Sequence, residues 1–252
     1  MYERIIDMSN AVAIIPARGG SKRIPRKNIK LFHGIPLIAY SIQTALKSNL
    51  FKKVIVSTDD EEIAKIAREY GAEIPFIRPK ELSDDFTGTG AVVTHALNHL
   101  KSVGENYNLI CTIYATAPFL QEKYLIEGFN KLQSSNAKSA FSCTSMPFPI
   151  QRTFKITKNE RCEMFWPENF TKRSQDLEEA YQDAGQFYWT NLNIQSNEII
   201  FGKDSIPIVL PRFLVQDIDT PEDWERAEIM YEVIQKIKNK DSSYEKTEYK
   251  NN

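Results

Sequence analysis

Residues 11–28 read AVAIIPARGGSKRIPRKN, a short apolar run that passes directly into a cationic loop. The apolar part, residues 11–17, has the length of a buried strand. The loop that follows, residues 18–28, holds five Lys or Arg side chains, no acidic side chain and two adjacent glycines. Ligands of α/β proteins bind at the carboxyl ends of strands, so this loop is predicted to bind a polyphosphate.

The residue types in this loop suit phosphate groups. Gly19 and Gly20 let the backbone turn tightly and bring bare N–H groups against a ligand, and Ser21 and Asn28 add neutral donors. Arg binds phosphate bidentately, whereas Lys acts as a mobile point charge. The loop matches neither the Walker A pattern nor Gly-x-Gly-x-x-Gly, which disfavours P-loop and dinucleotide sites. The alternative is a solvated basic loop without a ligand.

Strand-like and helix-like segments alternate through the first half of the chain. Apolar runs predict further strands at residues 52–58, 108–115 and 137–144. Apolar residues at helical spacing predict helices at residues 36–48, 60–70, 89–103 and 122–135. This order predicts an α/β, Rossmann-like fold, with a mostly parallel sheet and helices on both faces.

The helix expected at residues 60–70 has a start signal. Asp59 can cap its first turn, and Glu62, three residues later, completes a capping box. This structural role explains Asp59 fully, and a role in a ligand site remains the alternative.

The pattern changes near residue 145. Residues 146–185 are rich in Pro, Arg, Gln and Glu without a clear period. They predict an arm that crosses to a partner subunit or folds over the site. Strands resume at residues 186–194 and 206–210, and a last helix is expected after Thr220, with Pro at its first position.

These segments divide the chain into three parts. An N-terminal extension, residues 1–10, precedes a single domain at residues 11–238, into which the arm is inserted. The polar tail, residues 239–252, lacks apolar anchors and is expected to be disordered.

Composition argues against several classes of protein. The 252 residues carry 32 basic and 33 acidic side chains, a net charge of -1, so the basic excess of a nucleic-acid binder is missing. No apolar run reaches the roughly 18 residues of a membrane helix, and Met1–Asn10 lacks the apolar core of a secretory signal. The three cysteines fit neither a zinc motif nor a disulfide framework. We expect a cytoplasmic protein that binds neither nucleic acid nor membrane.

Asp217 and Asp219 lie two residues apart, just before the last expected helix. Side chains two apart in an extended chain point to the same side, where two carboxylates repel unless a cation lies between them. Mg²⁺ or Mn²⁺ would be such a cation, and Mg²⁺ is commonly held by one or two carboxylates and substrate phosphates. The alternative is that Asp219 helps to cap the last helix while Asp217 is solvated.

Several segments resemble motifs of the CMP-sugar-acid synthetases, the family that includes the CMP-sialic acid synthetases. They are IPARGGSKRIPRKN (15–28), VSTDDEEIA (56–64), RPKELSDD (78–85), YATAPF (114–119), KRSQDL (172–177), DAGQFYW (183–189) and QDIDTPEDW (216–224). They follow the order of the family and span about residues 11–235.

The resemblance implies that the first loop holds the phosphates and ribose of CTP. The implied contacts are Arg18, Gly19, Gly20, Ser21, Lys27 and Asn28. Lys27 is best placed to stabilise charge on the transferring phosphate and the departing pyrophosphate. Arg78 matches the stretch that recognises cytosine, and its structural alternative is a charge at a strand end. We hypothesise that Asp217 or Asp219 accepts the proton of the sugar hydroxyl.

Departures from the sialic-acid enzymes bear on the sugar. Tyr114 stands where those enzymes usually have Gln, and residues 183–189 differ from their Asn-Gly-Ala-Ile-Tyr segment. Residues 173–189 look closer to the pseudaminic acid cytidylyltransferases, whose sugar has acylamino and methyl groups in place of hydroxyls. The candidate sugar contacts are Tyr114, Gln186, Phe187 and Tyr188, with Arg173 for the sugar carboxylate. The alternative for the aromatic side chains is core packing.

The expected reaction is attack by the anomeric hydroxyl of a nonulosonic acid, pseudaminic acid above all, on the α-phosphorus of CTP. The sequence offers no convincing covalent nucleophile, and His95 and His99 lack the Glu of a zinc-protease motif. The alternatives are a sialic or legionaminic acid as substrate, a sugar-1-phosphate nucleotidylyltransferase, and a non-catalytic module that binds CTP for regulation. Family members are typically dimers that exchange an arm, so we expect a homodimer.

Overall fold

The computed structural model describes residues 10–248, with side chains through residue 237. Apart from Asn10, the expected N-terminal extension lies outside the described residues. Among the helices of residues 10–248, none combines the length and the apolar character needed to span a membrane.

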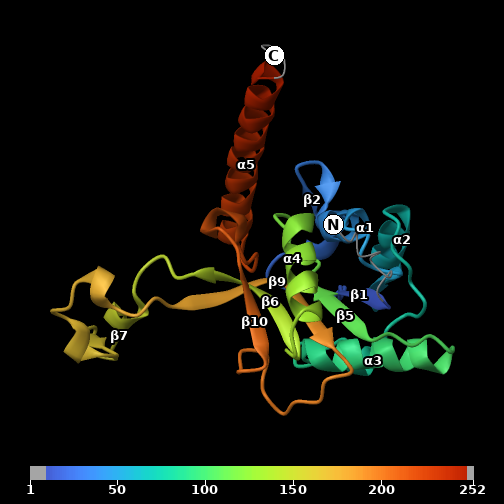
Figure 1. Cartoon of the computed structure of the whole chain (residues 1–252), viewed down its shortest axis with the longest axis horizontal. Helices are drawn as coiled ribbons and strands as arrows, with labels where there is room; N and C mark the ends of the chain where they lie inside the picture. Colours follow the sequence, from blue (N-terminus) through green and yellow to red (C-terminus); the bar gives the residue numbers. More distant parts are fainter. Residues whose placement is uncertain (1–9, 249–252) are drawn as a thin grey trace.

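A six-stranded sheet forms the centre of the protein (Figure 1). Its strands are β1 (Ala11–Pro16), β4 (Lys53–Ser57), β5 (Leu109–Ile113), β6 (Ser139–Ser145), β9 (Tyr181–Asn191) and β10 (Ser205–Val209). Their order across the sheet is β10-β6-β9-β5-β1-β4. All neighbouring pairs are parallel except those of β9, which runs antiparallel to β5 and β6. The mostly parallel sheet predicted from the sequence is confirmed.

Helices cover both faces of this sheet. They are α1 (Leu37–Lys47), α2 (Glu61–Glu69), α3 (Thr89–Ser102), α4 (Glu122–Gln133) and α5 (Pro221–Glu248). Alternate side chains of β1 point to opposite faces. Ala13 and Ile15 join the larger core cluster with residues of α1, α2, α4 and α5. Ile14 joins the smaller cluster with residues of α3. The predicted α/β arrangement with helices on both faces follows from this alternation.

The start of α2 corrects the sequence prediction. Asp60, not Asp59, caps this helix, because its Oδ1 accepts hydrogen bonds from the N–H groups of Glu62 and Ile63, both at 3.0 Å. Two adjacent acidic residues precede the helical period, and the sequence pattern does not distinguish them. Asp59 is therefore available for another role.

Helix α5 begins as predicted. Thr220 and Asp223 cap each other, with Asp223 N–H donating to Thr220 Oγ1 at 3.2 Å and Thr220 N–H to Asp223 Oδ2 at 2.8 Å. The helix then runs to Glu248 and projects from the body (Figure 1). The helix thus includes residues 239–248, for which the sequence predicts disorder, and that prediction stays open. The segment contains no Gly or Pro that would stop the helix; the expected tail at residues 249–252 lies outside the described residues.

A short hairpin fixes the first loop to the start of α5. It consists of β2 (Leu31–Phe32) and β3 (Ile35–Pro36). The fully buried Phe32 packs edge-on against Trp224, with ring centroids 5.5 Å apart, and the ammonium of Lys30 lies 4.1 Å from the Trp224 ring centroid. Segments nearly 200 residues apart in sequence are held side by side, which positions Asp217 and Asp219 near the loop.

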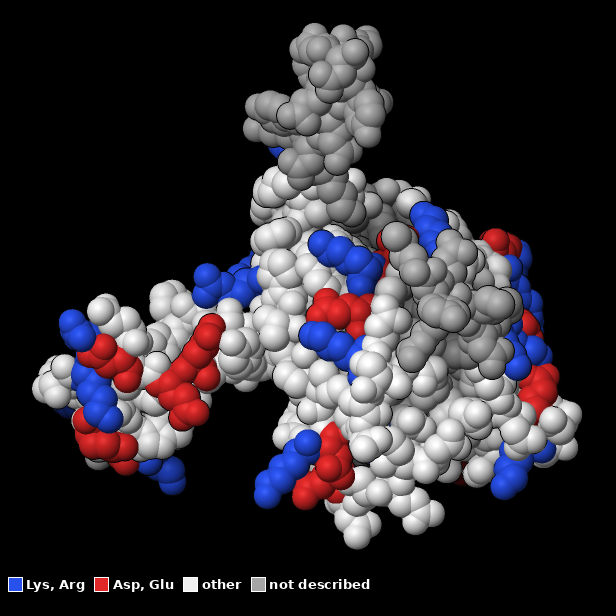
Figure 2. Space-filling model, viewed as in Figure 1, with Lys and Arg blue, Asp and Glu red and all other residues white. Residues whose placement is uncertain are grey.

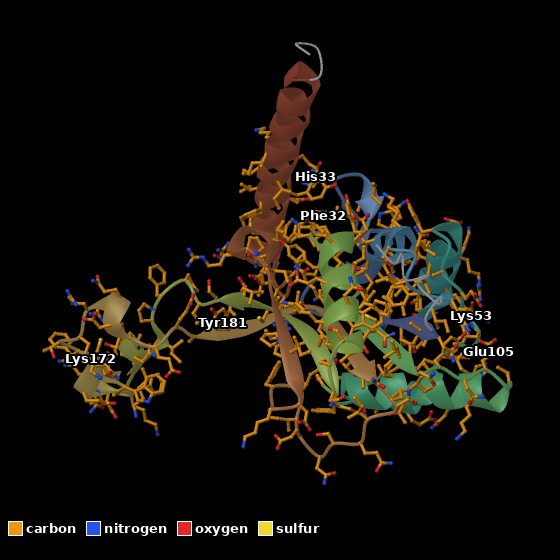
Figure 3. The ribbon with its side chains drawn as sticks, viewed as in Figure 1. Phe32, His33, Lys53, Glu105, Lys172 and Tyr181 are labelled. Carbon is orange, nitrogen blue, oxygen red and sulfur yellow. The ribbon has the colours of Figure 1, made fainter. Side chains whose placement is uncertain are left out.

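Residues 146–180 form an arm that extends away from the body (Figures 1 and 3). The arm contains an antiparallel hairpin of β7 (Phe154–Ile156) and β8 (Cys162–Met164). In Figure 3, Lys172 lies in the far part of the arm and Tyr181 near its base. The strand expected at residues 186–194 begins earlier, because residues 181–185 already belong to β9, where Asp183 pairs with Cys143 of β6. The arm returns the chain without a crossover helix, so β9 pairs antiparallel with β6.

Candidate active site

The loops after β1 and β5, together with the segment that leads from α2 into α3, line a cavity of about 340 Å³. This volume is in the range of small-molecule sites, roughly 300–1,000 Å³. Its charged and polar lining includes Arg18, Ser21, Lys22, Arg23, Lys27, Asn28, Arg78, Asp84, Asp85, Thr87, Thr89, Tyr114, Thr116 and Asp219. The structure thus gathers the first loop, Arg78, Tyr114 and Asp219 around one volume.

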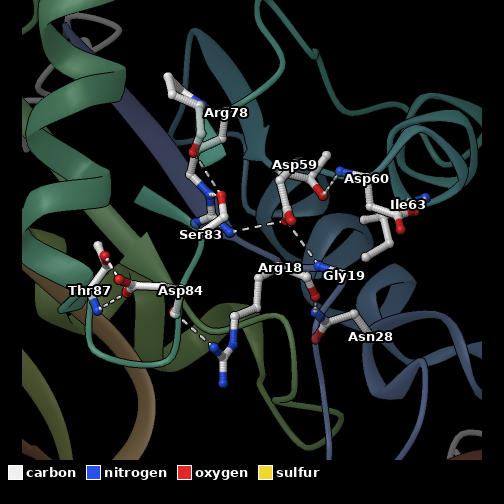
Figure 4. A network of polar contacts seen from close by, with 12 residues as sticks. Arg18, Gly19, Asn28, Asp59, Asp60, Ile63, Arg78, Ser83, Asp84 and Thr87 are labelled. Carbon is white, nitrogen blue, oxygen red and sulfur yellow. Dashed lines mark hydrogen bonds and ion pairs between the residues drawn. The ribbon is translucent and has the colours of Figure 1, made fainter. Parts of the chain in front are cut away.

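Hydrogen bonds hold the first loop in shape (Figure 4). The Asn28 side-chain amide donates to the Arg18 carbonyl at 2.9 Å and ties the two ends of the loop together. The Gly19 N–H donates to Asp59 Oδ1 at 3.0 Å, which fixes the loop to the end of β4. A Cβ at Gly19 would lie 2.7 Å from Asp60 Oδ2, so the close approach requires glycine. A Cβ at Gly20 would meet no atom within 4 Å.

The two glycines form a matched pair for mutagenesis. Gly19→Ala is expected to lower Tm by several degrees, because forcing a methyl group into a packed contact costs about 1–3 kcal/mol, and each kcal/mol lowers Tm by roughly 2–4 °C at this size. Gly20→Ala should leave Tm unchanged yet raise KM for CTP about tenfold, because the methyl group would enter the space where the bare N–H groups are expected to meet phosphates. Thermal melts and CTP titrations of both variants check this. Unchanged CTP kinetics in Gly20→Ala would contradict a phosphate at that position.

Carboxylates pair with each cation of the loop. Arg18 Nη1 lies 2.6 Å from Asp85 Oδ1, and Lys22 pairs with the other oxygen of the same carboxylate. Arg26 pairs with Asp60 and Glu62, which holds it away from the cavity lining. Lys22 and Arg18 keep the pKa of Asp85 below its usual value. A triphosphate that binds here competes with Asp85 for Arg18 and Lys22.

Arg78 is buried and not a solvated strand-end charge. Its guanidinium donates from Nε to Ser83 Oγ at 3.1 Å, and its Nη2 lies 3.5 Å from Asp59 Oδ1 (Figure 4). Burial lowers the pKa of Arg78, while the Asp59 carboxylate opposes that shift. Asp59 therefore links the Gly19 backbone to the guanidinium of Arg78. Asp59 thus contacts two residues of the candidate site, which the capping interpretation of the sequence did not predict.

The first loop meets the aspartate pair directly. Lys27 Nζ donates to the Ile218 carbonyl at 2.5 Å and lies 3.2 Å from Asp219 Oδ1. Arg23 Nη2 lies 2.9 Å from Asp219 Oδ2. Asp217 flanks the same carbonyl. Asp217 is exposed as a residue, but protein atoms partly desolvate its carboxyl group. This desolvation and the charge of Asp219 raise the pKa of Asp217.

The donor set at Asp217 and Asp219 fits a hard divalent ion that takes its other ligands from a substrate. Asp219 lines the cavity beside the loop cations, whereas Asp217, two residues earlier, is exposed and does not line it. Among residues 10–248, no three His, Cys, Asp or Glu side chains gather into a metal-binding group. A closed structural metal site is thus not formed by these residues, whereas Mg²⁺ needs only one or two carboxylates when phosphates complete its shell.

The candidate sugar contacts divide into two groups. Tyr114 lines the cavity, and its ring lies against that of the buried Tyr188, with centroids 5.3 Å apart. Phe187 points to the other face of β9 and lies in the main core, fully buried. Gln186 is also buried, and its amide donates to the Leu214 carbonyl at 2.5 Å. Of these four candidates, only Tyr114 lines the cavity, and Gln186, Phe187 and Tyr188 stay predictions as sugar contacts.

Arg173 lies in the arm and does not line the cavity of its own chain. Its Nε and Nη2 donate to the two oxygens of Asp176 at 2.7 and 2.9 Å in an exposed bidentate pair. Arg173 thus binds the carboxylate of Asp176 through two hydrogen bonds, the geometry in which it would bind a sugar carboxylate.

Sequence reasoning did not assign three residues that the structure places at or beside the site. Asp85 pairs with two loop cations, Thr89 lies 3.5 Å from the Tyr114 hydroxyl, and Asp183 accepts a hydrogen bond from Tyr188. Asp85 and Asp183 belong to the RPKELSDD and DAGQFYW segments, so their motif membership was the available signal.

Comparison with known proteins agrees with this geometry. Residues 12–247 match a family model described as Cytidylyltransferase. A pseudaminic acid cytidylyltransferase of Campylobacter jejuni subsp. jejuni serotype O:2 is 48% identical, covering 88% of this chain and 96% of the relative. A CMP-N,N'-diacetyllegionaminic acid synthase of Legionella pneumophila is 30% identical, over 89% and 97%.

The fold is also shared with a solved structure. CMP:2-keto-3-deoxy-manno-octonic acid synthetase complexed with CTP superposes with a TM-score of 0.63, at 14% identity, covering 88% of this chain and 98% of that one. Similarity over nearly the whole chain, together with the cationic loop facing Asp219, leads to one conclusion. The chain belongs to the cytidylyltransferase family.

Proposed function

We propose that this protein transfers CMP from CTP to the anomeric hydroxyl of pseudaminic acid and releases pyrophosphate. The hydroxyl oxygen bonds to the α-phosphorus as the bond from that phosphorus to the bridging oxygen of the β-phosphate breaks. The hydroxyl proton passes to a carboxylate. The observation that carries the proposal is the contact of Arg23 and Lys27 with Asp219 across the cavity. Because CTP is a cytoplasmic metabolite, we place the reaction in the cytoplasm.

The first loop would bind the triphosphate. Phosphate oxygens replace Asp85 as partners of Arg18 and Lys22, and the backbone at Gly20 has open space in front of it for close approach. Lys27 is half-buried, so its charge acts in a less screened environment than a surface lysine. It would neutralise negative charge that develops on the transferring phosphate and on pyrophosphate.

Asp217 and Asp219 would hold Mg²⁺ or Mn²⁺. The ion would neutralise phosphate oxygens and favour loss of the hydroxyl proton. Asp219 would exchange its contacts with Arg23 and Lys27 for the ion, which frees both cations for phosphate. Either Asp217 or Asp219 would accept the hydroxyl proton.

Arg78 would read the cytosine. Its guanidinium lines the cavity while Asp59 and Ser83 hold its orientation. The carbonyl oxygen and ring nitrogen of cytosine are both acceptors, which suits a buried Arg fork. We propose pseudaminic acid rather than legionaminic acid as the acceptor sugar because of the two relatives. The pseudaminic acid cytidylyltransferase is 48% identical to this chain, and the legionaminic acid synthase is 30% identical.

We also propose that the protein is a homodimer joined through the arm. The arm exposes apolar side chains that a stable monomer would bury: Phe148 (77% exposed), Phe154, Ile156 (74%), Phe165, Trp166 and Phe170 (73%). Charged groups of both signs lie among them (Figure 2). Such a patch marks a protein interface. A partner's arm laid over the cavity would bring Arg173 to the sugar carboxylate.

Substitution within this patch tests the dimer. Phe170→Asp is expected to convert a dimer to a monomer in light scattering, because it places a charge in an apolar interface. It should lower kcat/KM for the sugar acid more than for CTP, since the cation of Arg173 would be lost from the sugar site. Lys158→Ala, in the hairpin turn of the same arm, is the matched control and should remain dimeric. A wild-type protein that is monomeric at micromolar concentration would contradict the proposal.

The reaction is tested by supplying CTP and Mg²⁺ with a panel of pseudaminic, legionaminic and sialic acids. CMP-linked product identified by mass, with equimolar pyrophosphate, is expected with pseudaminic acid. Product from another acid alone would correct the sugar. CTP binding without pyrophosphate release from any acid would instead favour a regulatory module.

A further inference from the structure

A short acidic segment lines the cavity together with the cationic first loop. Residues 83–88, which we call the strap, lie between a 3-10 turn (Lys80–Leu82) and α3. Asp84, Asp85 and Thr87 of the strap line the same cavity as the cations of residues 18–28. The strap therefore adjoins the groups that would bind phosphate.

The strap has its own internal structure. Asp84 Oδ1 accepts hydrogen bonds from the N–H groups of Phe86 and Thr87, at 3.0 and 2.7 Å. The side chain of Phe86 is 94% exposed, and a Cβ at Gly88 would meet no atom within 4 Å. The turn is thus closed by local contacts, and the space around its far end leaves room for it to shift as a unit.

Ion pairs join the strap to the first loop. Asp85 Oδ1 accepts a hydrogen bond from Arg18 Nη1 at 2.6 Å, and Asp85 Oδ2 pairs with the ammonium of Lys22. Each carboxylate oxygen thus faces one cation, as two oxygens of a phosphate group would. The hydrogen bonds from Lys22 and Arg18 hold the pKa of Asp85 below its usual value, so the group is ionised at neutral pH. Asp85 therefore occupies the cations as an anionic ligand would.

The two cations can exchange this carboxylate for phosphate without rebuilding the loop. Arg18 Nη1 also donates to the Asp84 carbonyl at 2.9 Å (Figure 4). This neutral carbonyl keeps the guanidinium at the cavity when Asp85 leaves, while the positive charge becomes available to a ligand. The side chain of Lys22 is 79% exposed, and its flexible stem lets the ammonium turn from Asp85 to a phosphate oxygen.

We propose that Asp85 is an internal counter-anion, which occupies Arg18 and Lys22 in the free enzyme, yields them to a polyphosphate and takes them back when pyrophosphate leaves. This inference rests on the proposed function, which makes pyrophosphate a product. CTP and pyrophosphate must each displace a carboxylate that is already in place, so both bind more weakly than they would without Asp85. Asp85 thereby hastens the loss of pyrophosphate, because a weaker complex mostly dissociates faster.

Asp85→Asn removes the charge with little change of shape. The amide offers one acceptor oxygen in place of two, so it cannot hold both Arg18 and Lys22. In calorimetric titrations with Mg²⁺ present, Kd for inorganic pyrophosphate and for CTP is expected to fall about three- to tenfold, the effect of removing two partly exposed ion pairs. The inhibition constant of pyrophosphate in the CMP-transfer assay should fall by the same factor.

Glu81→Gln is the matched control. Glu81 is exposed, lies in the turn just before the strap and does not line the cavity, so this variant removes the same charge from outside the cavity lining. Its Kd values should stay within about twofold of wild type at physiological ionic strength, where exposed charges beyond roughly 8 Å are largely screened. If Asp85 merely held the first loop in shape, Asp85→Asn would bind both ligands more weakly, so tighter binding distinguishes the two roles.

The arms of the experiment separate the possible failures. Pyrophosphate binding by Asp85→Asn that is weakened, or tightened less than about threefold relative to Glu81→Gln, would overturn the inference. If Asp85→Asn fails to fold, hydrogen exchange of the wild-type enzyme decides. Inorganic pyrophosphate should slow exchange in residues 18–28 and speed it in residues 83–88, because the strap is released; strap exchange that does not rise would overturn the inference. A wild-type enzyme that forms no CMP-sugar from any acid would instead refute the proposed function.

Discussion

Replacing Lys27 with alanine is expected to lower kcat about 100- to 1,000-fold, the usual effect of removing one preorganised charge from a transition state. Lys27 is half-buried and reaches both Ile218 and Asp219, so no neighbouring lysine can replace its ammonium. KM for CTP should change much less, because Arg18 and Arg23 still line the cavity. Pyrophosphate release at saturating CTP and sugar measures the effect.

Lys30→Ala is the matched control for this prediction. Lys30 lies just beyond the same loop, but its ammonium stacks on Trp224 and not on the cavity. Its loss should leave kcat within about twofold and reduce stability slightly, by about 0.5–1 kcal/mol for an exposed cation–π contact. A Lys27→Ala enzyme with kcat within tenfold of wild type would remove Lys27 from the catalytic group.

Asp217→Asn is expected to abolish turnover at saturating Mg²⁺ while CTP still binds. The amide has nearly the shape of the carboxylate, but it neither neutralises a divalent ion nor accepts the hydroxyl proton. Loss of several kcal/mol of metal-assisted stabilisation corresponds to a decrease in kcat of about 1,000-fold or more. Folding should not suffer, because the change removes a charge that Asp219 repels.

Calorimetric CTP titration and a thermal melt accompany the activity measurement. Glu222→Gln in the first turn of α5 removes a nearby acidic charge without touching the cavity lining and should remain active. Full activity in Asp217→Asn would contradict the assignment. Loss of folding in that variant would move Asp217 from chemistry to structure.

The strands and helices could be predicted because their periods are written locally in the sequence. Residues 11–17 are a continuous apolar run because both faces of β1 are buried. Ile15 belongs to the core cluster on one face and Ile14 to the core cluster on the other. The direction of β9 has no such local signal, since it depends on how the arm returns the chain. The choice of Asp60 over Asp59 as helix cap depends on backbone geometry that either residue could adopt.

The sequence predicted the part of the candidate site whose motifs have residue types that suit a single ligand, the polyphosphate. The loop cations and Asp219 do meet across the cavity, over a sequence separation that no periodicity reveals. The sugar contacts were harder, although strand geometry offered a clue. Neighbouring residues of a strand point to opposite faces, so Phe187 and Tyr188 could not both line one cavity. The hydrogen bond from Tyr188 to Asp183 and the ring contact of Tyr188 with Tyr114 became visible only in three dimensions.

The most direct test of the nucleotide site is a crystal structure with a non-hydrolysable CTP analogue and Mn²⁺, with the ion located by its anomalous scattering. We predict that the triphosphate lies between residues 18–28 and Asp219, with Arg23 and Lys27 turned from the carboxylate to phosphate oxygens and Mn²⁺ at Asp217 and Asp219. A triphosphate bound outside this cavity, or an ion remote from both aspartates, would contradict the account.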